Sequence, residues 1–200
     1  MNFIVQKAEI KNAIDIALLH KKEIPTGFIS SLNLKVVKKL YESIITNEII
    51  FVLENESTIV GFVSCAKNTG ILYKKFIKKN LFAVAPYFVL KVFSFSFIKK
   101  IFETLTAPKK TKLDNEEIPE LLSIVIDSNQ QAKGLGKLLL DELENKLVED
   151  KIKKYKVVAG DNLISANKFY NKYGFTLSAQ TELHKGAISN IYTKILLNND

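Results

Sequence analysis

The stretch Ser123–Leu147 restricts the fold of this chain more than any other part of its sequence. An apolar run at 123–126 leads into a loop that carries Gly134 and Gly136, and the loop opens directly onto an amphipathic run. This pattern predicts a strand, a tight loop and a helix. Free backbone N–H groups at a helix start can bind an anion, and glycines let a phosphate approach the backbone. The alternative is a plain strand–helix connection in which the glycines only make the turn.

Two common phosphate-binding loops do not fit these residues. A P-loop has a glycine where this chain has Gln131, and a serine or threonine where it has Leu138. A dinucleotide-binding fingerprint has a third small residue where this chain has Leu139. The loop therefore predicts a phosphate site of another kind, with Lys133 and Lys137 adding positive charge beside it.

Length and composition predict a single domain over residues 1–200. The chain has 200 residues, of which 47% are apolar and 25% are charged, as is ordinary for a folded globular protein. The one cysteine, Cys65, stands in no metal-binding spacing, and no signal peptide pattern opens the sequence, so a cytoplasmic protein is expected. The net charge of +8 favours an anionic ligand or surface. Because no nucleic-acid-binding motif is recognisable, nucleic acid is not expected as a partner.

The rest of the chain predicts a mixed α/β sheet with flanking helices. The polar turn at 55–57 joins two strands into a hairpin, and Gly174 is predicted to end the last helix. The periodicity predicts strands at 2–8, 49–54, 58–66, 118–126, 155–159, 175–179 and 188–196, and helices at 11–22, 34–45, 134–149 and 163–173.

A second motif, Ala166–Phe175, has the residues Ala-Asn-Lys-Phe-Tyr-Asn-Lys-Tyr-Gly-Phe. Together with Gln131–Gly136 it resembles the GNAT superfamily of acyl-CoA-dependent N-acetyltransferases. The first motif is similar to the family's Gln/Arg-x-x-Gly-x-Gly/Ala loop, and the second to its Ala-x-x-x-Tyr-x-x-x-Gly-Phe helix. The resemblance is strong over 118–176 and extends to the order of elements over 2–66. It implies a GNAT-like fold: a central, largely antiparallel sheet with a splayed parallel pair, flanking helices, and here a helical insertion between the third and fourth strands.

The resemblance also implies acetyl-CoA as cosubstrate and assigns its binding residues. The strand backbone would pair with the pantetheine arm, and the loop amides would bind the pyrophosphate. The family places an Asn three residues before the motif alanine, whereas Asn162 lies four before Ala166. Asn162 and Asn167 are therefore alternative ligands of the CoA arm. The other implied cofactor-binding residues are Ile124, Val125 and Ile126 of the strand, and Gln131, Ala132, Lys133, Gly134, Leu135, Gly136 and Lys137 of the loop.

Attack of an amine on a thioester needs a base for the amine and an acid for the departing thiolate. The resemblance assigns the acid to Tyr170, and the alternative is a core tyrosine at helical spacing. Strand alternation puts Glu120 on the same face as Ile126, which makes Glu120 the predicted base. Glu116 and Glu117 are fallbacks, and the alternative for Glu120 is a solvated carboxylate at the strand end.

On the acceptor side the sequence says less. In the family the loop between the first two helices borders the acceptor, so Gly27 and Phe28 are predicted to bind substrate, with His20 as a further candidate. His184 is expected on a surface turn. The predicted function is direct acetyl transfer, in a ternary complex, to a primary amine of a small molecule. A loose similarity of 25–32 and of the insertion to GNAT proteins of bacterial surface-polysaccharide metabolism suggests an amino sugar. The alternatives are a non-catalytic acyl-CoA-binding or membrane-docked module, and a protein N-acetyltransferase.

Residues 71–117 form the predicted insertion and linker. The part at 71–105 is rich in Phe and Lys, and its apolar stretch approaches a membrane span in length but contains Pro86 and Lys91. Three interpretations stay open: amphipathic helices on an anionic membrane, a cover over the acceptor cleft or a homodimer interface, and extra core with a lysine-rich solvent face. The candidate partners of a cytoplasmic enzyme are thus an anionic membrane, contacted peripherally, and a second copy of the chain in a homodimer.

Overall fold

The computed structural model describes residues 2–80, 118–184 and 187–196. Their contacts cluster into two compact units, each assembled from segments that are far apart in the sequence. Of the described residues, unit 1 comprises 2–66, 121–153 and 195–196, and unit 2 comprises 67–80, 118–120, 154–184 and 187–194. The prediction of one domain over the whole chain stays a prediction. Among the described residues, no helix has the length and apolar character needed to cross a membrane.

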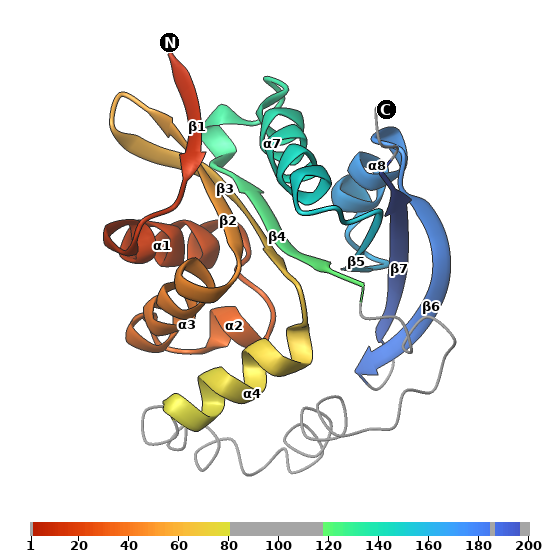
Figure 1. The fold of residues 1–200 in the computed structure, drawn as a ribbon, viewed down its shortest axis with the longest axis horizontal. Coiled ribbons are helices and arrows are strands. Elements are labelled where there is room, and N and C mark those ends of the chain that lie inside the picture. Colours follow the sequence, from red (N-terminus) through yellow and green to blue (C-terminus); the bar gives the residue numbers. More distant parts are fainter. Residues whose placement is uncertain (1, 81–117, 185–186, 197–200) are drawn as a thin grey trace. The chain divides into compact units, whose positions relative to one another are not determined.

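Unit 1 is built on neighbouring strands in the order β1-β2-β3-β4 (Figure 1). β1 pairs antiparallel with β2, and β2 pairs antiparallel with β3. Glu56 and Ser57 connect β2 to β3 with φ of 49° and 66°, which is the left-handed geometry of a tight hairpin turn. The predicted hairpin is therefore confirmed. The strands are β1 (Phe3–Lys7), β2 (Ile49–Asn55), β3 (Thr58–Ala66) and β4 (Glu120–Ile126).

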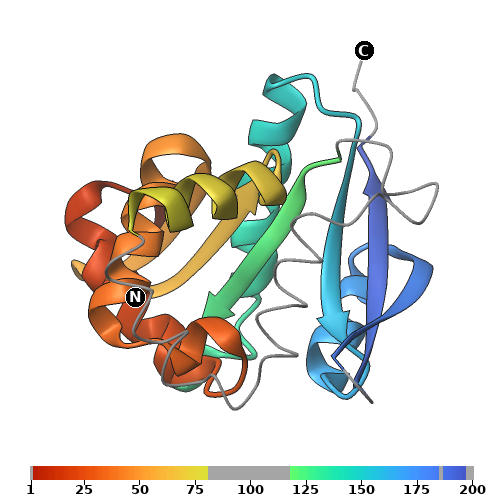
Figure 2. The ribbon, with the colours of Figure 1, turned by 90° about the horizontal axis from the view of Figure 1, so that it is seen from below.

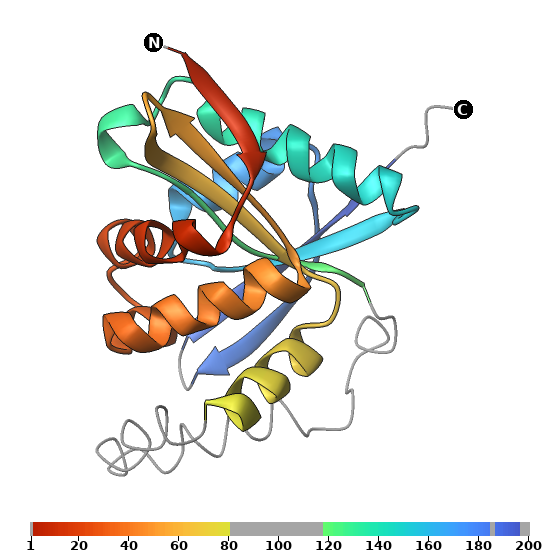
Figure 3. The same cartoon turned by 60° about the vertical axis from the view of Figure 1, so that its left-hand side comes forward.

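Helices cover both faces of this sheet (Figure 3). Gly61 and Phe62 are consecutive in β3, so they face opposite sides. Phe62 packs against His20 of α1 and Tyr41 of α3. A Cβ at Gly61 would lie 3.3 Å from Leu139 of α7. α1 and α3 thus cover one face and α7 the other. The helices are η1 (Ile10–Asn12), α1 (Ala13–Glu23), α2 (Phe28–Ser31), α3 (Leu34–Asn47), η4 (Ser128–Gln130) and α7 (Leu135–Glu149).

A leucine stripe explains why α7 lies on the sheet. Its buried residues recur at helical spacing, so one face of the helix is apolar along its whole length. They are Leu135, Leu139, Leu140, Leu143 and Leu147. This stripe fixes the position of the helix start, and with it the loop that the sequence predicts to bind phosphate.

Unit 2 contains neighbouring strands in the order β5-β7-β6, with β6 and β7 forming an antiparallel hairpin. Figure 2 shows β6 and β7 side by side, with α8 close to them. The predicted glycine stop is confirmed, because α8 is followed by its C-cap Tyr173 and then by Gly174, which has φ of 83°. The N–H of Phe175 donates to the carbonyl of Tyr170 at 3.0 Å. The elements are α4 (Thr69–Lys79), β5 (Lys154–Gly160), α8 (Ile164–Lys172), β6 (Thr176–His184) and β7 (Ala187–Ile195).

The predicted class, a mixed α/β fold with flanking helices, is confirmed. The strand expected at 175–179 continues to His184 as β6, because it pairs with β7 along nearly its full length. α4 confirms a helix at the start of the predicted insertion. Residues 81–117, with Pro86, Lys91, Glu116 and Glu117, lie outside the described residues.

Candidate active site

The loop that precedes α7 has an unusual backbone. Ala132 and Gly134 both have left-handed φ, of 62° and 77°. Between Gln131 and Gly136 no backbone N–H donates a well-formed hydrogen bond to a described residue. Gly134 is the N-cap of α7, and no side chain caps this helix start. Unpaired N–H groups at a helix N-terminus carry partial positive charge, so the loop has the chemistry of an anion site.

Space for a ligand is open above this loop. A Cβ placed on Gly134 would meet no atom within 4 Å, and Ala132, Lys133 and Gly134 are exposed. The side chain of Lys133 donates to Gln130 Oε1 at 2.7 Å, and Lys137 pairs with Asp141 one helical turn further on. Lys133 thus lies within the loop and Lys137 in the first turn of α7.

β4 leads into the loop with one edge turned away from β3. The N–H of Asp127 donates to the carbonyl of Val60 on β3 at 2.8 Å. Backbone groups of successive strand residues point to alternate edges, so those of Ile124 and Ile126 point away from β3. Val125 between them is buried. The backbone groups of Ile124 and Ile126, the predicted pantetheine contacts, therefore lie on the edge of β4 that faces away from β3.

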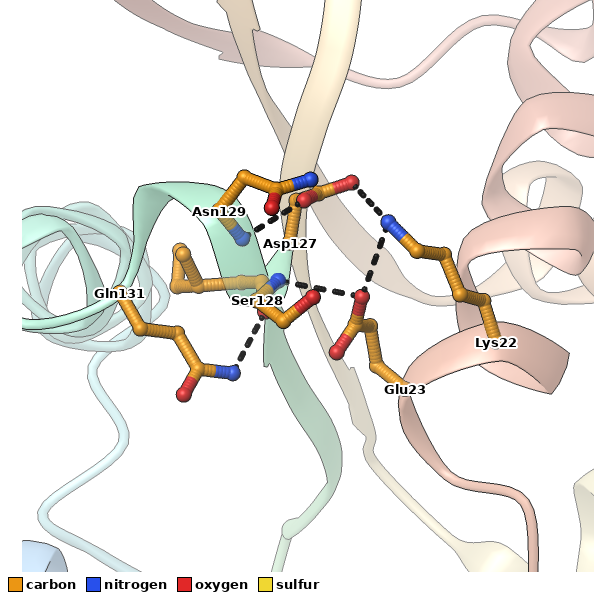
Figure 4. A network of polar contacts seen from close by, with 7 residues as sticks. Lys22, Glu23, Asp127, Ser128, Asn129 and Gln131 are labelled. Atoms are coloured by element: carbon orange, nitrogen blue, oxygen red, sulfur yellow. Dashed lines mark hydrogen bonds and ion pairs between the residues drawn. The ribbon is translucent and has the colours of Figure 1, made fainter.

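Side chains tie this strand and loop together (Figure 4). Gln131 Nε2 donates to the carbonyl of Ile126 at 3.0 Å, which folds the loop start back onto the strand end. Asp127 Oδ1 accepts the N–H of Asn129 at 3.0 Å and so caps the short helix η4. The loop is thus held at its base, while its N–H groups further along stay open.

The end of α1 contacts the same base (Figure 4). Lys22 Nζ lies 2.7 Å from Asp127 Oδ2 and 3.2 Å from Glu23 Oε1. Glu23 Oε1 also accepts the N–H of Ser128 at 3.1 Å. The hydrogen bond from Lys22, followed by the backbone hydrogen bond from Asn129, holds the pKa of Asp127 below its usual value. The sequence analysis missed this network, because its partners are distant in sequence and no motif marks them.

The loop after α1 carries the predicted substrate residues Gly27 and Phe28. Gly27 is exposed and has φ of 112°, and it precedes the short helix α2. Lys21 Nζ donates to the carbonyls of Ser30 and Leu32 at 2.5 and 2.7 Å, which holds this loop against α1. The structure brings Gly27 and the phosphate loop into the same unit.

His20 is not placed to meet an acceptor. It is buried, its Nδ1 lies 2.6 Å from Tyr41 Oη, and its ring stacks on Phe62. Burial, and secondarily the charge of Lys21, lowers the pKa of His20 to about 4. His20 is therefore a neutral core residue at physiological pH. The side chain of the other histidine, His184, lies outside the described residues.

Unit 2 holds Tyr170 inside an aromatic cluster. Its ring is buried, with Phe175, Phe169 and Tyr192 at centroid distances of 5.3, 5.6 and 5.9 Å. Burial raises the pKa of the Tyr170 hydroxyl, which keeps the phenol protonated. Tyr170 Oη has no hydrogen-bond partner among the described residues. The cluster thus fixes the ring and leaves its polar end uncommitted.

Of the two candidate asparagines, Asn167 is fully occupied by its own unit. Its Nδ2 donates to the carbonyls of Gly160 and Leu163, each at 2.9 Å. Its Oδ1 accepts from Asn190 Nδ2 at 3.0 Å and from Tyr192 Oη at 2.9 Å. Asn167 therefore connects the turn after β5 to β7. Asn162 is exposed, so the geometry favours it as the asparagine available to a ligand.

Glu120 stands at the start of β4 with one oxygen anchored. Its Oε2 accepts from Thr69 Oγ1 at 3.2 Å and lies 3.5 Å from Lys156 Nζ. Its Oε1 has no partner among the described residues. The side chain is 19% exposed, so it is sheltered but accessible. A carboxylate held by one oxygen presents the other in a fixed direction.

The comparisons with known proteins agree with this geometry. Residues 111–194 match the family model described as an acetyltransferase (GNAT) domain. The matched range contains both motifs, Gln131–Gly136 and Ala166–Phe175, and the chain has a GNAT-like fold. No curated protein matches the chain.

Solved GNAT structures share the fold along nearly the whole chain. An N-acetyltransferase from Staphylococcus aureus Mu50 has a TM-score of 0.64 at 13% identity, covering 98% of this chain and 100% of that one. A GNAT acetyltransferase from Streptococcus pneumoniae has a TM-score of 0.59 at 18% identity, with the same coverage of 98% and 100%. The PaiA N-acetyltransferase of Thermoplasma acidophilum, in complex with coenzyme A, has a TM-score of 0.59 at 12% identity, covering 98% and 99%. At identities this low, the similarity to these proteins shows the fold alone.

Proposed function

We propose that this GNAT protein transfers the acetyl group of acetyl-CoA directly to a primary amine of a small molecule, within a ternary complex. One observation carries the proposal: the unpaired N–H groups between Gln131 and Gly136, at the uncapped start of α7. They supply several converging donors for a pyrophosphate, and the left-handed Gly134 leaves room for it. The edge of β4 that faces away from β3 would continue the site along the pantetheine arm through Ile124 and Ile126.

In the proposed reaction the amine nitrogen forms a bond to the thioester carbonyl carbon, and the carbon–sulfur bond breaks. Glu120 takes a proton from the acceptor ammonium through its unpartnered Oε1, and the neutral amine that results then attacks. Tyr170 gives a proton to the departing thiolate. The hydroxyl is protonated, because burial raises its pKa, and it has no hydrogen-bond partner among the described residues, so it can donate toward the sulfur.

The acceptor side is proposed from the loop after α1. Gly27 and Phe28 line this loop, and an amino sugar is the acceptor class suggested by the sequence. A contact with an anionic membrane, and a homodimer, remain predictions attached to the insertion. Asn162 is proposed as the ligand of the CoA arm, since Asn167 is occupied by Gly160, Asn190 and Tyr192.

Two measurements test the proposal. Acetyl-CoA binds only the folded protein, so it is expected to raise Tm at concentrations above its Kd. No shift at millimolar acetyl-CoA would contradict the cofactor site. Release of free CoA thiol is then followed with amino sugars, small alkyl amines and a peptide with a free N-terminus. An enzyme releases CoA with one class of acceptor. Binding without release from any acceptor would favour the non-catalytic acyl-CoA-binding module, and release with the peptide alone would favour a protein N-acetyltransferase.

A further inference from the structure

Two residues in the last turn of α1, Lys22 and Glu23, contact the base of the phosphate loop (Figure 4). Lys22 contacts Asp127 and Glu23, and Glu23 accepts the N–H of Ser128. We propose that Lys22 and Glu23 are positioning residues that hold the loop in its anion-binding form before acetyl-CoA arrives. This inference rests on the proposed function of the loop, and it assigns a role to residues that lie outside both GNAT motifs.

The loop needs support from its neighbours because its backbone conformation is energetically unfavourable. Left-handed φ at Ala132, a residue with a Cβ, persists only where surrounding contacts impose it. Its N–H groups are unpaired, so backbone hydrogen bonds to described residues do not hold its outer part in place. The anchors lie at the base, where Gln131 binds Ile126 and Asp127 caps η4. A loop fixed in advance loses less conformational entropy when its ligand binds, which raises affinity.

Charge gives Lys22 a second effect. Glu23 and Asp127 place two carboxylates at the base of a loop that is to bind a pyrophosphate. The Nζ of Lys22 lies between them, 3.2 Å from one and 2.7 Å from the other. Without this cation the carboxylates would repel each other, and both would repel the anionic ligand. Loss of the Lys22 charge should therefore weaken pyrophosphate binding most at low ionic strength, since salt screens the repulsion.

The neighbouring lysine provides a local comparison. Lys21 extends from the same helical turn, but it donates to the carbonyls of Ser30 and Leu32 in the loop after α1. Two adjacent lysines thus hold two different loops. A substitution of Lys21 disturbs the end of α1 without removing a contact to the phosphate loop. It therefore distinguishes the effect of a looser helix end from the effect of losing the contacts of Lys22 with the loop.

The test compares the affinity for CoA with that for pantetheine, which lacks the pyrophosphate, by isothermal titration calorimetry. For Lys22→Met we expect the Kd for CoA to rise about tenfold, as loss of a charge-assisted contact implies. The Kd for pantetheine should stay unchanged. Lys22→Arg should restore most of the CoA affinity, because it keeps the charge. Lys38→Met, which removes an exposed ion pair with Glu42 on α3, is the matched control and should bind CoA normally.

The outcomes separate this inference from the proposed function. If the wild-type chain fails to bind CoA, the proposed function is wrong. If the wild type binds CoA but Lys22→Met binds it like Lys38→Met, only the proposed positioning role of Lys22 and Glu23 is wrong. An equal loss for CoA and pantetheine in Lys22→Met, or the same CoA-selective loss in Lys21→Met, would also overturn it. Matching Tm values across the variants would show that all of them are folded in the assay.

Discussion

The ring of Phe175 lies edge-on against the ring of Tyr170, with 5.3 Å between their centroids. The two residues are also joined through the backbone, since the N–H of Phe175 donates to the carbonyl of Tyr170 around the left-handed Gly174. The second GNAT motif thus ends the helix and packs the tyrosine ring in one structural unit. Gly174 and Phe175 thereby fix the ring of Tyr170, whose hydroxyl has no hydrogen-bond partner among the described residues.

Replacement of Tyr170 by Phe is expected to lower kcat about a hundredfold, because general acid catalysis typically contributes that much or more. Stability should change little, since the hydroxyl gives up no hydrogen bond to a described residue. CoA affinity should also be retained. Steady-state kinetics, with calorimetry for CoA, give both values. An unchanged kcat would remove the acid role.

Tyr192 offers the matched control for this variant. Its ring belongs to the same cluster, but its Oη donates to Asn167 Oδ1 at 2.9 Å. Tyr192→Phe should therefore lower the free energy of unfolding by about 1 kcal/mol, as expected for a lost hydrogen bond, and keep kcat. The two phenols would then differ in kind: one supports the fold and the other the reaction.

Gly134→Ala tests the phosphate loop directly. The substitution puts a Cβ on a residue with φ of 77°, which costs about 1 kcal/mol of stability. The new methyl group points into open space, where the pyrophosphate is proposed to lie. We expect the Kd for CoA to rise at least about tenfold. Gly70→Ala in α4 is the control: it has ordinary φ and lies outside the loop, so CoA affinity should not change.

Local chemistry made much of this fold predictable from the sequence. The loop, the helix after it and the cap at Gly174 follow from glycine geometry and leucine periodicity, which act over a few residues. The extent of β6 was misjudged because the pairing with β7, rather than the sequence of β6 itself, carries the strand to His184. Strand ends depend on partners that periodicity does not reveal.

Contacts between distant segments could not be predicted. Lys22 and Asp127 are separated by 105 positions, and neither residue has a pattern around it that names the other. The same holds for Asn167. The family motif suggests it as a ligand, but its side-chain amide already forms hydrogen bonds with Gly160, Asn190 and Tyr192. His20 was open to an acceptor-side role only because its burial against Tyr41 and Phe62 was unknown.

Glu120→Gln is expected to lower kcat about a hundredfold at neutral pH, the contribution of a general base. The loss should shrink as pH approaches the pKa of the acceptor amine, because the free amine then needs no base. Thr69→Val removes the hydrogen bond to Oε2 but keeps the carboxylate, so kcat should fall far less. A pH–rate profile for the three proteins distinguishes these cases. A Glu120→Gln profile that matches the wild type at every pH would leave the carboxylate without a role as base.

The buried pair of His20 and Tyr41 should make the protein sensitive to acid. The pKa of His20 is lowered from 6.5 to about 4, so between these values the unfolded chain binds a proton that the folded chain does not. Stability is therefore expected to fall as pH drops from about 6.5 to about 4, by about 3 kcal/mol in total.

His20→Asn keeps an acceptor near Tyr41 Oη but cannot titrate. Its free energy of unfolding should be lower at pH 7, because packing is lost, yet flatter across this window. Urea unfolding at pH 7, 6, 5 and 4 measures both slopes. If His20→Asn loses stability with acid as steeply as the wild type, another group is responsible.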